Sequence, residues 1–286
     1  MNSIMITGGT GSFGRACVRK LLDIPFGSAF WHSRIVIYSR DEHKQEQMAR
    51  EFENNERLRF FIGDVRDRDR LILGMAGCYT VIHAAAMKIV PTAEYNPMEC
   101  IKTNVMGAQN VIDAAMMQRI QCVMALSTDK AVNPLNLYGA SKLCAEKLFL
   151  ASNNVSDTRF SVVRYGNVAN SNGSVIPLFK EQLSKGLPLT VTHEDMTRYW
   201  ITLDEAVDFV LGCIWNMKGG EVFLPDMPSF KVMDLARATS DKIRITGIRP
   251  GEKLHEQIDQ DKYSNINDAW LDQDNLKQKL KDMGAI

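Results

Sequence analysis

The chain has 286 residues, of which 45% are hydrophobic and 24% charged, which is typical of an ordinary soluble globular protein. Its 34 basic residues balance its 34 acidic residues, so the net charge of +0 favours neither a nucleic acid nor an anionic membrane as a partner. An anionic small-molecule substrate remains compatible with this balance. No apolar run approaches the roughly 20 residues that a membrane-spanning helix needs.

The six cysteines and five histidines indicate neither a disulfide framework nor a metal site. No two cysteines form a C-x-x-C pair, and the histidines lack the spacing of metal ligands. The first residues lead directly into a strand pattern instead of a signal peptide. We therefore expect a cytoplasmic protein with reduced thiols and no metal.

A glycine-rich turn follows the first predicted strand, residues 3–7. Such a turn permits close approach of the backbone to a pyrophosphate, and the helix beginning near Phe13 directs its N-terminal amides toward the phosphates. A purely structural turn is the alternative. We expect dinucleotide binding by Gly8, Thr10, Gly11, Ser12, Phe13 and Gly14.

The second predicted strand, residues 34–38, ends in a hydroxyl and a guanidinium, Ser39 and Arg40, with the ammonium of Lys44 one turn later. Cofactors with a free ribose 2′-hydroxyl usually meet an acidic residue at this place. A basic cluster suits a 2′-phosphate instead, so we predict NADP. The alternative is a solvated helix start.

Further cofactor and substrate contacts are predicted after strands 58–62 and 80–83. An aspartate after the first of these strands can accept from the adenine amino group, and small side chains after the second let the cofactor lie close. The following loop is placed to reach substrate. A long helix is then expected over residues 97–119, with a buried amide that anchors a proton-relay water. The residues are Asp64, Val65, Ala84, Ala85, Ala86, Lys88, Glu94 and Asn104.

A candidate oxidation site follows the buried strand 122–126. In the helix predicted over residues 137–150, Tyr138 and Lys142 lie one turn apart on one face. An ammonium beside a phenol favours the phenolate, which can take a proton from a sugar hydroxyl while hydride leaves the same carbon. Thr128, at the strand end, is placed to hold that hydroxyl. Tyr138 and Lys142 are also expected to contact the cofactor.

The alternation of strands and helices predicts an α/β fold, a Rossmann-type doubly wound parallel sheet with a smaller C-terminal lobe. After strand 160–164 the alternation weakens, so we expect a cofactor-binding domain over residues 1–166 and a mainly substrate-binding lobe, interleaved with it, over 167–286. Elements expected in that lobe are helices near 175–185, 203–216 and from 231, strands 221–224 and 243–248, and a helical tail. The aromatic connection 24–33 packs on the fold or forms an oligomer contact, and we expect a homo-oligomer.

Four motifs carry a family resemblance. They are Thr-Asp-Lys-Ala-x-x-Pro-x-Asn-x-Tyr-Gly-Ala-Ser-Lys (128–142), Arg-Tyr-Gly-Asn-Val (164–168), Met-Thr-Arg-Tyr-Trp-Ile (196–201) and Arg-Pro-Gly-Glu-Lys-Leu-His-Glu (249–256). Together they resemble the soluble inverting UDP-N-acetylglucosamine 4,6-dehydratases of the extended short-chain dehydrogenase/reductase superfamily. Tyr-Ser-Arg-Asp-Glu (38–42) is similar to that group's NADP-binding segment. The likeness extends from residue 3 to about 258.

The resemblance implies roles that the residues alone do not. Thr128, Tyr138 and Lys142 match the superfamily's oxidation triad, Asp129 the acid for the leaving C6 hydroxyl, and Lys130 the C5 base. Dehydratases that retain the C5 configuration usually have glutamate at the position of Lys130. Segments that bind the diphosphate and uridine are matched at Asn167, Ser174, Val175, Arg198, Arg249 and Glu252.

The chain departs from the group's pattern at three positions on the expected sugar and phosphate wall. Ile89 stands where histidine is usual, Asn170 where glycine is expected, and Asn172 where a basic residue is expected. These departures bear on the identity of the substrate and on rate more than on fold.

The resemblance implies that UDP-N-acetylglucosamine, or a close UDP-sugar, becomes UDP-2-acetamido-2,6-dideoxy-L-arabino-hexos-4-ulose for modified-sugar glycans. The rival enzymes are a UDP-sugar 4-epimerase, which needs no acid–base pair for elimination, and a C5-retaining 4,6-dehydratase. The rival without catalysis is an idle dinucleotide-binding scaffold.

Overall fold

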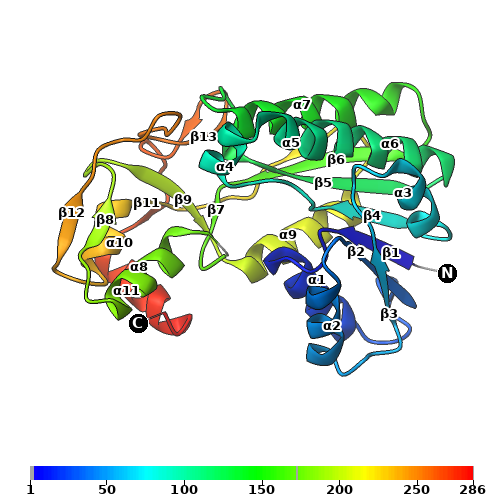
Figure 1. The fold of residues 1–286 in the computed structure, drawn as a ribbon, viewed down its shortest axis with the longest axis horizontal. Coiled ribbons are helices and arrows are strands. Elements are labelled where there is room, and N and C mark those ends of the chain that lie inside the picture. The colour runs from blue at the N-terminus through cyan, green and yellow to red at the C-terminus, as the bar shows by residue number, and fades with distance from the viewer. Residues whose placement is uncertain (1–2, 172, 286) are drawn as a thin grey trace.

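Seven parallel strands form the sheet of the larger lobe in the computed structural model, which describes residues 3–171 and 173–285 (Figure 1). Their order is β10-β6-β5-β4-β1-β2-β3, which confirms the predicted doubly wound fold. Continuous apolar runs suit strands that are buried on both faces. The strands are β1 (Ser3–Thr7), β2 (Arg34–Ser39), β3 (Leu58–Ile62), β4 (Thr80–His83), β5 (Cys122–Thr128), β6 (Arg159–Tyr165) and β10 (Val222–Phe223).

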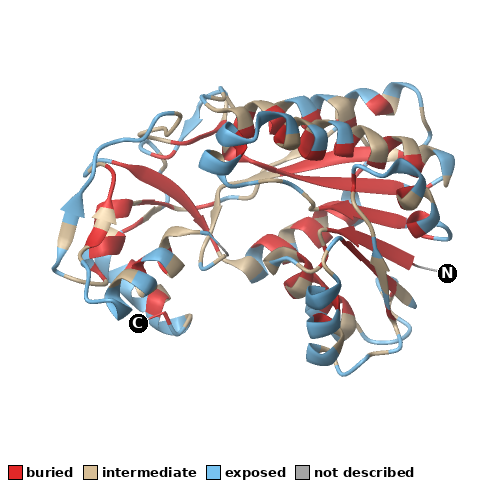
Figure 2. Cartoon of the chain, in the orientation of Figure 1, coloured by how far each residue is buried: buried red, intermediate tan, exposed pale blue. Residues whose placement is uncertain are grey.

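Helices cover both faces of this sheet. One face packs against α1 (Ser12–Asp23), α2 (Glu42–Glu51) and α9 (Leu203–Asn216). The other packs against α3 (Arg68–Met75), α6 (Gly107–Met117) and α7 (Leu137–Ala151). Figure 2 shows the inner strands buried between helices whose outer faces are exposed. The short helices near the strand ends are α4 (Val90–Tyr95), α5 (Pro97–Ile101), η2 (Asp129–Ala131) and η3 (Ser152–Asn154).

The prediction of a single helix over residues 97–119 is wrong in one respect, because a π-helical turn, η1 (Lys102–Met106), separates α5 from α6. Such a turn inserts an extra residue into a helix and is frequent at functional sites. Here Thr103 and Asn104 are the buried residues of the turn. The α-helical periodicity continues on both sides, so the sequence gives no signal of the interruption.

Two elements that we expected in the smaller lobe belong to the larger one. Helix α9 packs against α1 and contributes Val207, Val210 and Leu211 to the core beneath the sheet. Strand β10 pairs with β6 at the edge of the sheet. The chain therefore returns to the larger lobe after it has entered the smaller one.

The smaller lobe contains a four-stranded sheet of order β15-β11-β9-β7 and two strand pairs. Its core includes Phe179, Trp200 and Phe230, and the expected C-terminal helix packs here through Leu276 and Leu280. Its strands are β7 (Asn167–Val168), β8 (Leu189–Val191), β9 (Thr197–Ile201), β11 (Ser229–Lys231), β12 (Ile243–Ile245), β13 (Gln257–Asp259), β14 (Lys262–Tyr263) and β15 (Trp270–Leu271). Its helices are α8 (Val175–Ser184), α10 (Val232–Arg237) and α11 (Gln273–Asp282).

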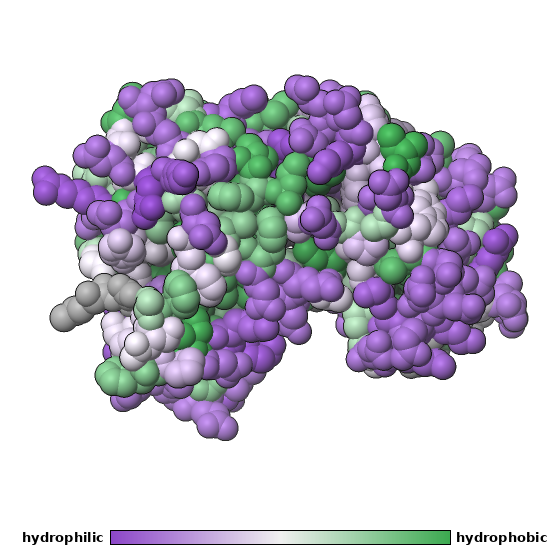
Figure 3. Space-filling model, turned by 180° about the vertical axis from the view of Figure 1, so that it is seen from behind, coloured by the Kyte–Doolittle hydropathy of each residue, from purple (hydrophilic) through white to green (hydrophobic). Residues whose placement is uncertain are grey.

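A partly buried arginine connects the two lobes. Arg164 on β6 donates two hydrogen bonds to the carboxylate of Glu146 on α7, at 3.1 and 2.7 Å, and a third to the carbonyl of Ile258 on β13, at 2.9 Å. Seen from behind, a notch at the lower edge separates the lobes (Figure 3). Within the described part of the chain, no helix has the length and apolarity needed to cross a membrane.

Candidate active site

A cleft of about 770 Å³ lies at the carboxyl ends of the parallel strands. The glycine turn after β1, the ends of β2 to β5 and the first turn of α7 form one side. The other side of the cleft includes residues 165–168, Ser171, Gly173, Ser174 and Arg249. In doubly wound sheets, ligands bind at this edge.

The glycine turn has the geometry that a pyrophosphate requires. Gly8 has φ +66°, a conformation that favours glycine, and a Cβ there would lie 2.9 Å from the Cα of Ala85. A Cβ at Gly14 would collide with the backbone of Gly9. Helix α1 begins at Ser12, directly after the turn. These residues fit a dinucleotide whose phosphates lie against the helix N-terminus.

A basic edge borders the cleft beyond the glycine turn. Ser39, Arg40 and Lys44 all line the wall. The guanidinium of Arg40 lies 3.5 Å from Asp64, which is bound more closely by Arg66 at 2.7 Å. Two arginines therefore already contact the carboxylate that we expected to bind adenine.

Asn104 does not line the cleft as the described residues define it. Its Oδ1 accepts from the amide of Met87 at 2.8 Å, and its Nδ2 donates to the carbonyl of the same residue at 2.9 Å. Nδ2 also lies 2.9 Å from the hydroxyl of Ser141. These bonds fix the loop that carries Ala84, Ala85, Ala86 and Lys88, which do line the cleft. The predicted proton-relay water at Asn104 stays a prediction.

Tyr138 and Lys142 are both buried on the inner face of α7 at the cleft. The ammonium of Lys142 donates to the carbonyl of Leu126 at 2.7 Å. Burial raises the pKa of Tyr138 to about 12, against the opposing charge of Lys130. Burial also lowers the pKa of Lys142 to about 8. Lys130 is thus a cation that favours the Tyr138 phenolate in this structure, a role that we expected from Lys142.

Asp129 and Lys130 form an ion pair directly after β5. Lys130 Nζ lies 2.9 Å from Asp129 Oδ1, which also accepts from the Thr128 hydroxyl at 3.0 Å. Burial raises the pKa of the Asp129 carboxyl, although the charge of Lys130 opposes it. Burial alone would lower the pKa of the Lys130 ammonium, but the negative charges of Asp129 and Glu256 outweigh burial and raise that pKa. Lys130 lines the cleft, whereas Asp129 is fully buried behind Gly166.

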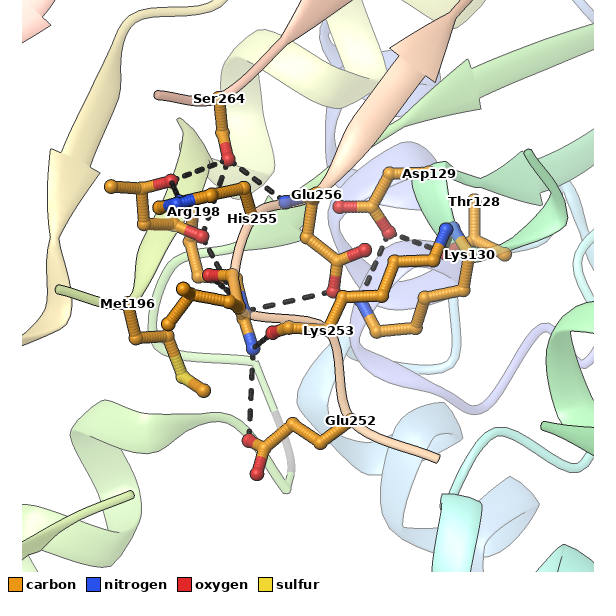
Figure 4. Close-up of polar contacts among 12 residues, drawn as sticks. Thr128, Asp129, Lys130, Met196, Arg198, Glu252, Lys253, His255, Glu256 and Ser264 are labelled. Carbon is orange, nitrogen blue, oxygen red and sulfur yellow. Dashed lines mark hydrogen bonds and ion pairs between the residues drawn. The ribbon is translucent and has the colours of Figure 1, made fainter. Parts of the chain in front are cut away.

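Glu256 was not among the site residues predicted from the sequence. Its Oε1 lies 3.2 Å from Lys130 Nζ and 3.6 Å from Arg198 Nε, and its side chain is buried (Figure 4). The only signal was its place at the end of the 249–256 motif, where we had assigned roles to Arg249 and Glu252.

The predicted substrate-binding residues are divided between the cleft and its supports. Lys88, Asn167, Ser174 and Arg249 line the cleft. Among the described residues, Asn167 Oδ1, Ser174 Oγ and Ser127 Oγ are buried atoms without a hydrogen-bond partner, which suits groups that bind a ligand.

The other four predicted substrate-binding residues do not line the cleft, as the described residues 3–171 and 173–285 define it. Glu94 accepts from the amide of Leu137 at 2.6 Å and so caps α7. Val175 is the first residue of α8. Arg198 donates to the carbonyls of residues 197, 253 and 254, and Glu252 lies 3.6 Å from it.

Two of the three departures can be placed. Ile89 is exposed on the wall of the cleft. Asn170 has φ +56°, the left-handed conformation that favours the glycine we expected there. Asn172 lies outside the described residues.

Comparison with known proteins places the chain in a family. Residues 4–270 match the family described as polysaccharide biosynthesis protein. The chain belongs to this family. It is 55% identical over 262 residues to a UDP-N-acetylglucosamine 4,6-dehydratase (inverting) of Campylobacter jejuni, covering 89% of this chain and 76% of that one. This match confirms the resemblance found in the sequence.

Other relatives are named for a different activity. A UDP-glucose 4-epimerase of Rickettsia canadensis is 43% identical over 265 residues, covering 90% of this chain and 77% of that one. Among solved structures, Pen from Bacillus thuringiensis has a TM-score of 0.91 at 32% identity and covers 98% of this chain and 97% of its own. The dTDP-glucose 4,6-dehydratase DesIV of Streptomyces venezuelae, solved with NAD, has a TM-score of 0.83 at 20% identity, covers 98% of this chain and 96% of its own, and supports the fold alone.

Proposed function

We propose that this protein is a C5-inverting UDP-N-acetylglucosamine 4,6-dehydratase that uses NADP. The observation that carries the proposal is the Asp129–Lys130 pair, at 2.9 Å, beside Tyr138 at the end of β5. An elimination needs an acid and a base side by side, and this pair supplies both. The 55% identity to the Campylobacter jejuni dehydratase supports the same activity.

In the proposed reaction, Tyr138 takes the proton of the sugar O4 while Thr128 holds that hydroxyl. The resulting 4-ketone acidifies the C5 proton, which Lys130 removes. Asp129 protonates the departing C6 hydroxyl, and C5 is then protonated on the opposite face, which inverts it. A nicotinamide held by the glycine turn beside Tyr138 and Lys142 would supply the hydride chemistry at C4 and C6, with no net consumption of a reductant.

The choice of NADP is supported by the basic edge of the cleft. Ser39, Arg40 and Lys44 line the wall, and a guanidinium binds phosphate through its planar fork of donors. The substrate's diphosphate and uridine are assigned to the opposite side, where Asn167, Ser174 and Arg249 lie. The related solved dehydratase and epimerase structures hold NAD, so the proposal distinguishes this chain from them.

Location and assembly belong to the same proposal. All six cysteines are free, which agrees with a reducing cytoplasm. We further propose a homo-oligomer, supported by the exposed Phe26 of the 24–33 segment, which would be covered by a second copy. Cell fractionation and light scattering test these two points.

A UDP-sugar 4-epimerase is the second candidate, since relatives of that name share 43–44% of the sequence. Purified protein incubated with UDP-N-acetylglucosamine and NADP+ separates the two. A dehydratase gives a product lighter by one water, whereas an epimerase gives a product of unchanged mass. No turnover on a panel of UDP-sugars would support an idle scaffold.

A further inference from the structure

Two carboxylates bracket the ammonium of Lys130. Its Nζ lies 2.9 Å from Asp129 Oδ1 and 3.2 Å from Glu256 Oε1. The same oxygen of Glu256 lies 3.6 Å from Arg198 Nε (Figure 4). Asp129 and Glu256 are 0% and 2% exposed, so their charges interact with little screening by solvent.

Glu256 is held in this position from two sides. Its backbone amide donates to the hydroxyl of Ser264 at 2.9 Å. Arg198, whose guanidinium is fixed by the carbonyls of Thr197, Lys253 and Leu254, contacts its carboxylate. Glu256 therefore presents a fixed negative charge to Lys130 from the smaller lobe.

Charged groups on several elements surround Lys130. Asp129 and Glu256 favour its protonated form, and Arg198 on β9 opposes it. Lys253, in the loop before β13, adds another positive charge nearby. Tyr138 on α7 and Tyr199 on β9 place their phenols beside this cluster.

The elimination needs a base without its proton and an acid that carries one. Lys130 and Asp129 can satisfy both conditions with a single proton. When the ammonium of Lys130 passes its proton to Asp129 along their hydrogen bond, Lys130 becomes the neutral base and Asp129 the protonated acid. The neutral amine then takes the C5 proton, and the electrons of that C–H bond form the C5–C6 double bond. The C6–O bond breaks as Asp129 protonates the oxygen, which leaves as water. The pair holds one proton before and after this step.

We propose that Glu256 is a positioning residue that holds Lys130 against Asp129 and favours retention of the proton that the pair shares. This inference rests on the proposed dehydratase function. A negative charge beside the pair makes the shared proton harder to lose, so Asp129 remains available as an acid. In agreement, Glu256 raises the pKa of both Asp129 and Lys130, and the carboxyl of Glu256 itself has a lowered pKa because Lys130 and Arg198 outweigh its burial.

The test is the pH profile of the elimination in the complete enzyme with NADP+ and UDP-N-acetylglucosamine. The rate of solvent deuterium entry at C5 is followed over a pH series in heavy water for wild type and Glu256→Gln. Loss of the neighbouring charge should move the profile to lower pH by roughly 1–3 units. Formation of reduced cofactor should persist, and Glu256→Asp, which keeps the charge, should return the profile toward the wild-type position.

Two further variants make the result specific. Glu252→Gln removes a carboxylate that lies in the same loop and contacts the same Arg198, but that is not an ion-pair partner of Lys130. The pH profile of this variant should therefore keep the wild-type position, whatever its rate. Arg198→Gln removes a positive charge and should move the profile to higher pH, which also provides the test if Glu256→Gln does not fold.

A slower Glu256→Gln enzyme with an unmoved profile would show that Glu256 is merely structural, and would overturn this inference alone. An unmoved profile in Arg198→Gln would do the same. A wild-type enzyme that forms no dehydrated product would instead overturn the proposed function, and this inference with it.

Discussion

The side-chain amide of Asn104 binds both backbone polar groups of Met87, accepting from its N–H at 2.8 Å and donating to its carbonyl at 2.9 Å. The π-helical turn η1 carries Asn104, and the loop around Met87 carries small residues of the cofactor wall. The interruption of the helix is therefore linked to the shape of the cleft.

Replacement of Asn104 tests this link. Asn104→Ala should destabilise the protein by about 1–3 kcal/mol, because two backbone groups lose their partner. It should also weaken NADP+ binding, since the loop is no longer fixed. Urea unfolding and cofactor titration measure the two effects. Gln109→Ala, which removes only a contact with Asp113, is the control, and equal effects from both variants would contradict this role for Asn104.

The proposed preference for NADP predicts a specific role for Arg40. Arg40→Ala should weaken NADP+ by roughly 1.5–3 kcal/mol and leave NAD+ nearly unchanged, because only the 2′-phosphate loses a charge-assisted contact. Fluorescence titration with both cofactors measures this. Arg66→Ala is the matched control, since Arg66 binds the same Asp64 but does not line the described part of the cleft. Equal affinity of the wild type for NAD+ and NADP+ would disprove the assignment.

Substitutions at Lys130 and Tyr138 should separate the oxidation step from the elimination step. Lys130→Ala should still form reduced cofactor in the presence of substrate, because Tyr138 and Lys142 remain, but should yield little 6-deoxy product. Tyr138→Phe should do neither. Absorbance of the reduced nicotinamide and chromatography of the sugar follow the two steps. Product formed by Lys130→Ala at the wild-type rate would mean that Lys130 is not the base.

The oxidation step should depend on pH through Tyr138. Burial raises the pKa of this phenol to about 12, so the rate of cofactor reduction should increase with pH as the phenolate forms. The positive charge of Lys130 lowers that pKa, so Lys130→Ala should move the rising limb to higher pH. Stopped-flow measurement across a pH series detects the shift, and a limb displaced to lower pH would refute this coupling.

Gly166 is expected to tolerate no side chain. A Cβ there would lie 2.6 Å from the Cβ of Tyr199 and 3.3 Å from Asp129 Oδ2. Gly166→Ala should therefore destabilise the protein by about 1–3 kcal/mol and reduce elimination by displacing Asp129. Gly212→Ala provides the control, because an added Cβ on α9 meets no atom within 4 Å. Thermal unfolding and product assays of both variants test this, and a fully active Gly166→Ala enzyme would contradict it.

The elements that the sequence predicted best are those whose signals are local. Buried apolar runs identified β1, β2, β4, β5 and β6, and the glycine turn and the Tyr138–Lys142 spacing identified much of the cleft wall. Strand β9 was recognised only as part of a motif, since its run of five buried residues includes a charged one, Arg198. Glu256 reaches Lys130 only through the packing of the smaller lobe against the larger one, a long-range contact that no local pattern encodes.

The most direct test of the central claim is the C5 configuration of the product formed from UDP-N-acetylglucosamine in heavy water. The account predicts a 4-keto-6-deoxy sugar with solvent deuterium at C5, and the L-arabino configuration from the first turnovers. Ring proton couplings, measured directly or after borohydride trapping, report that configuration. A D-xylo product formed from the start would mean retention at C5 and would contradict the account, whereas D-xylo that accumulates only late would reflect epimerisation in solution.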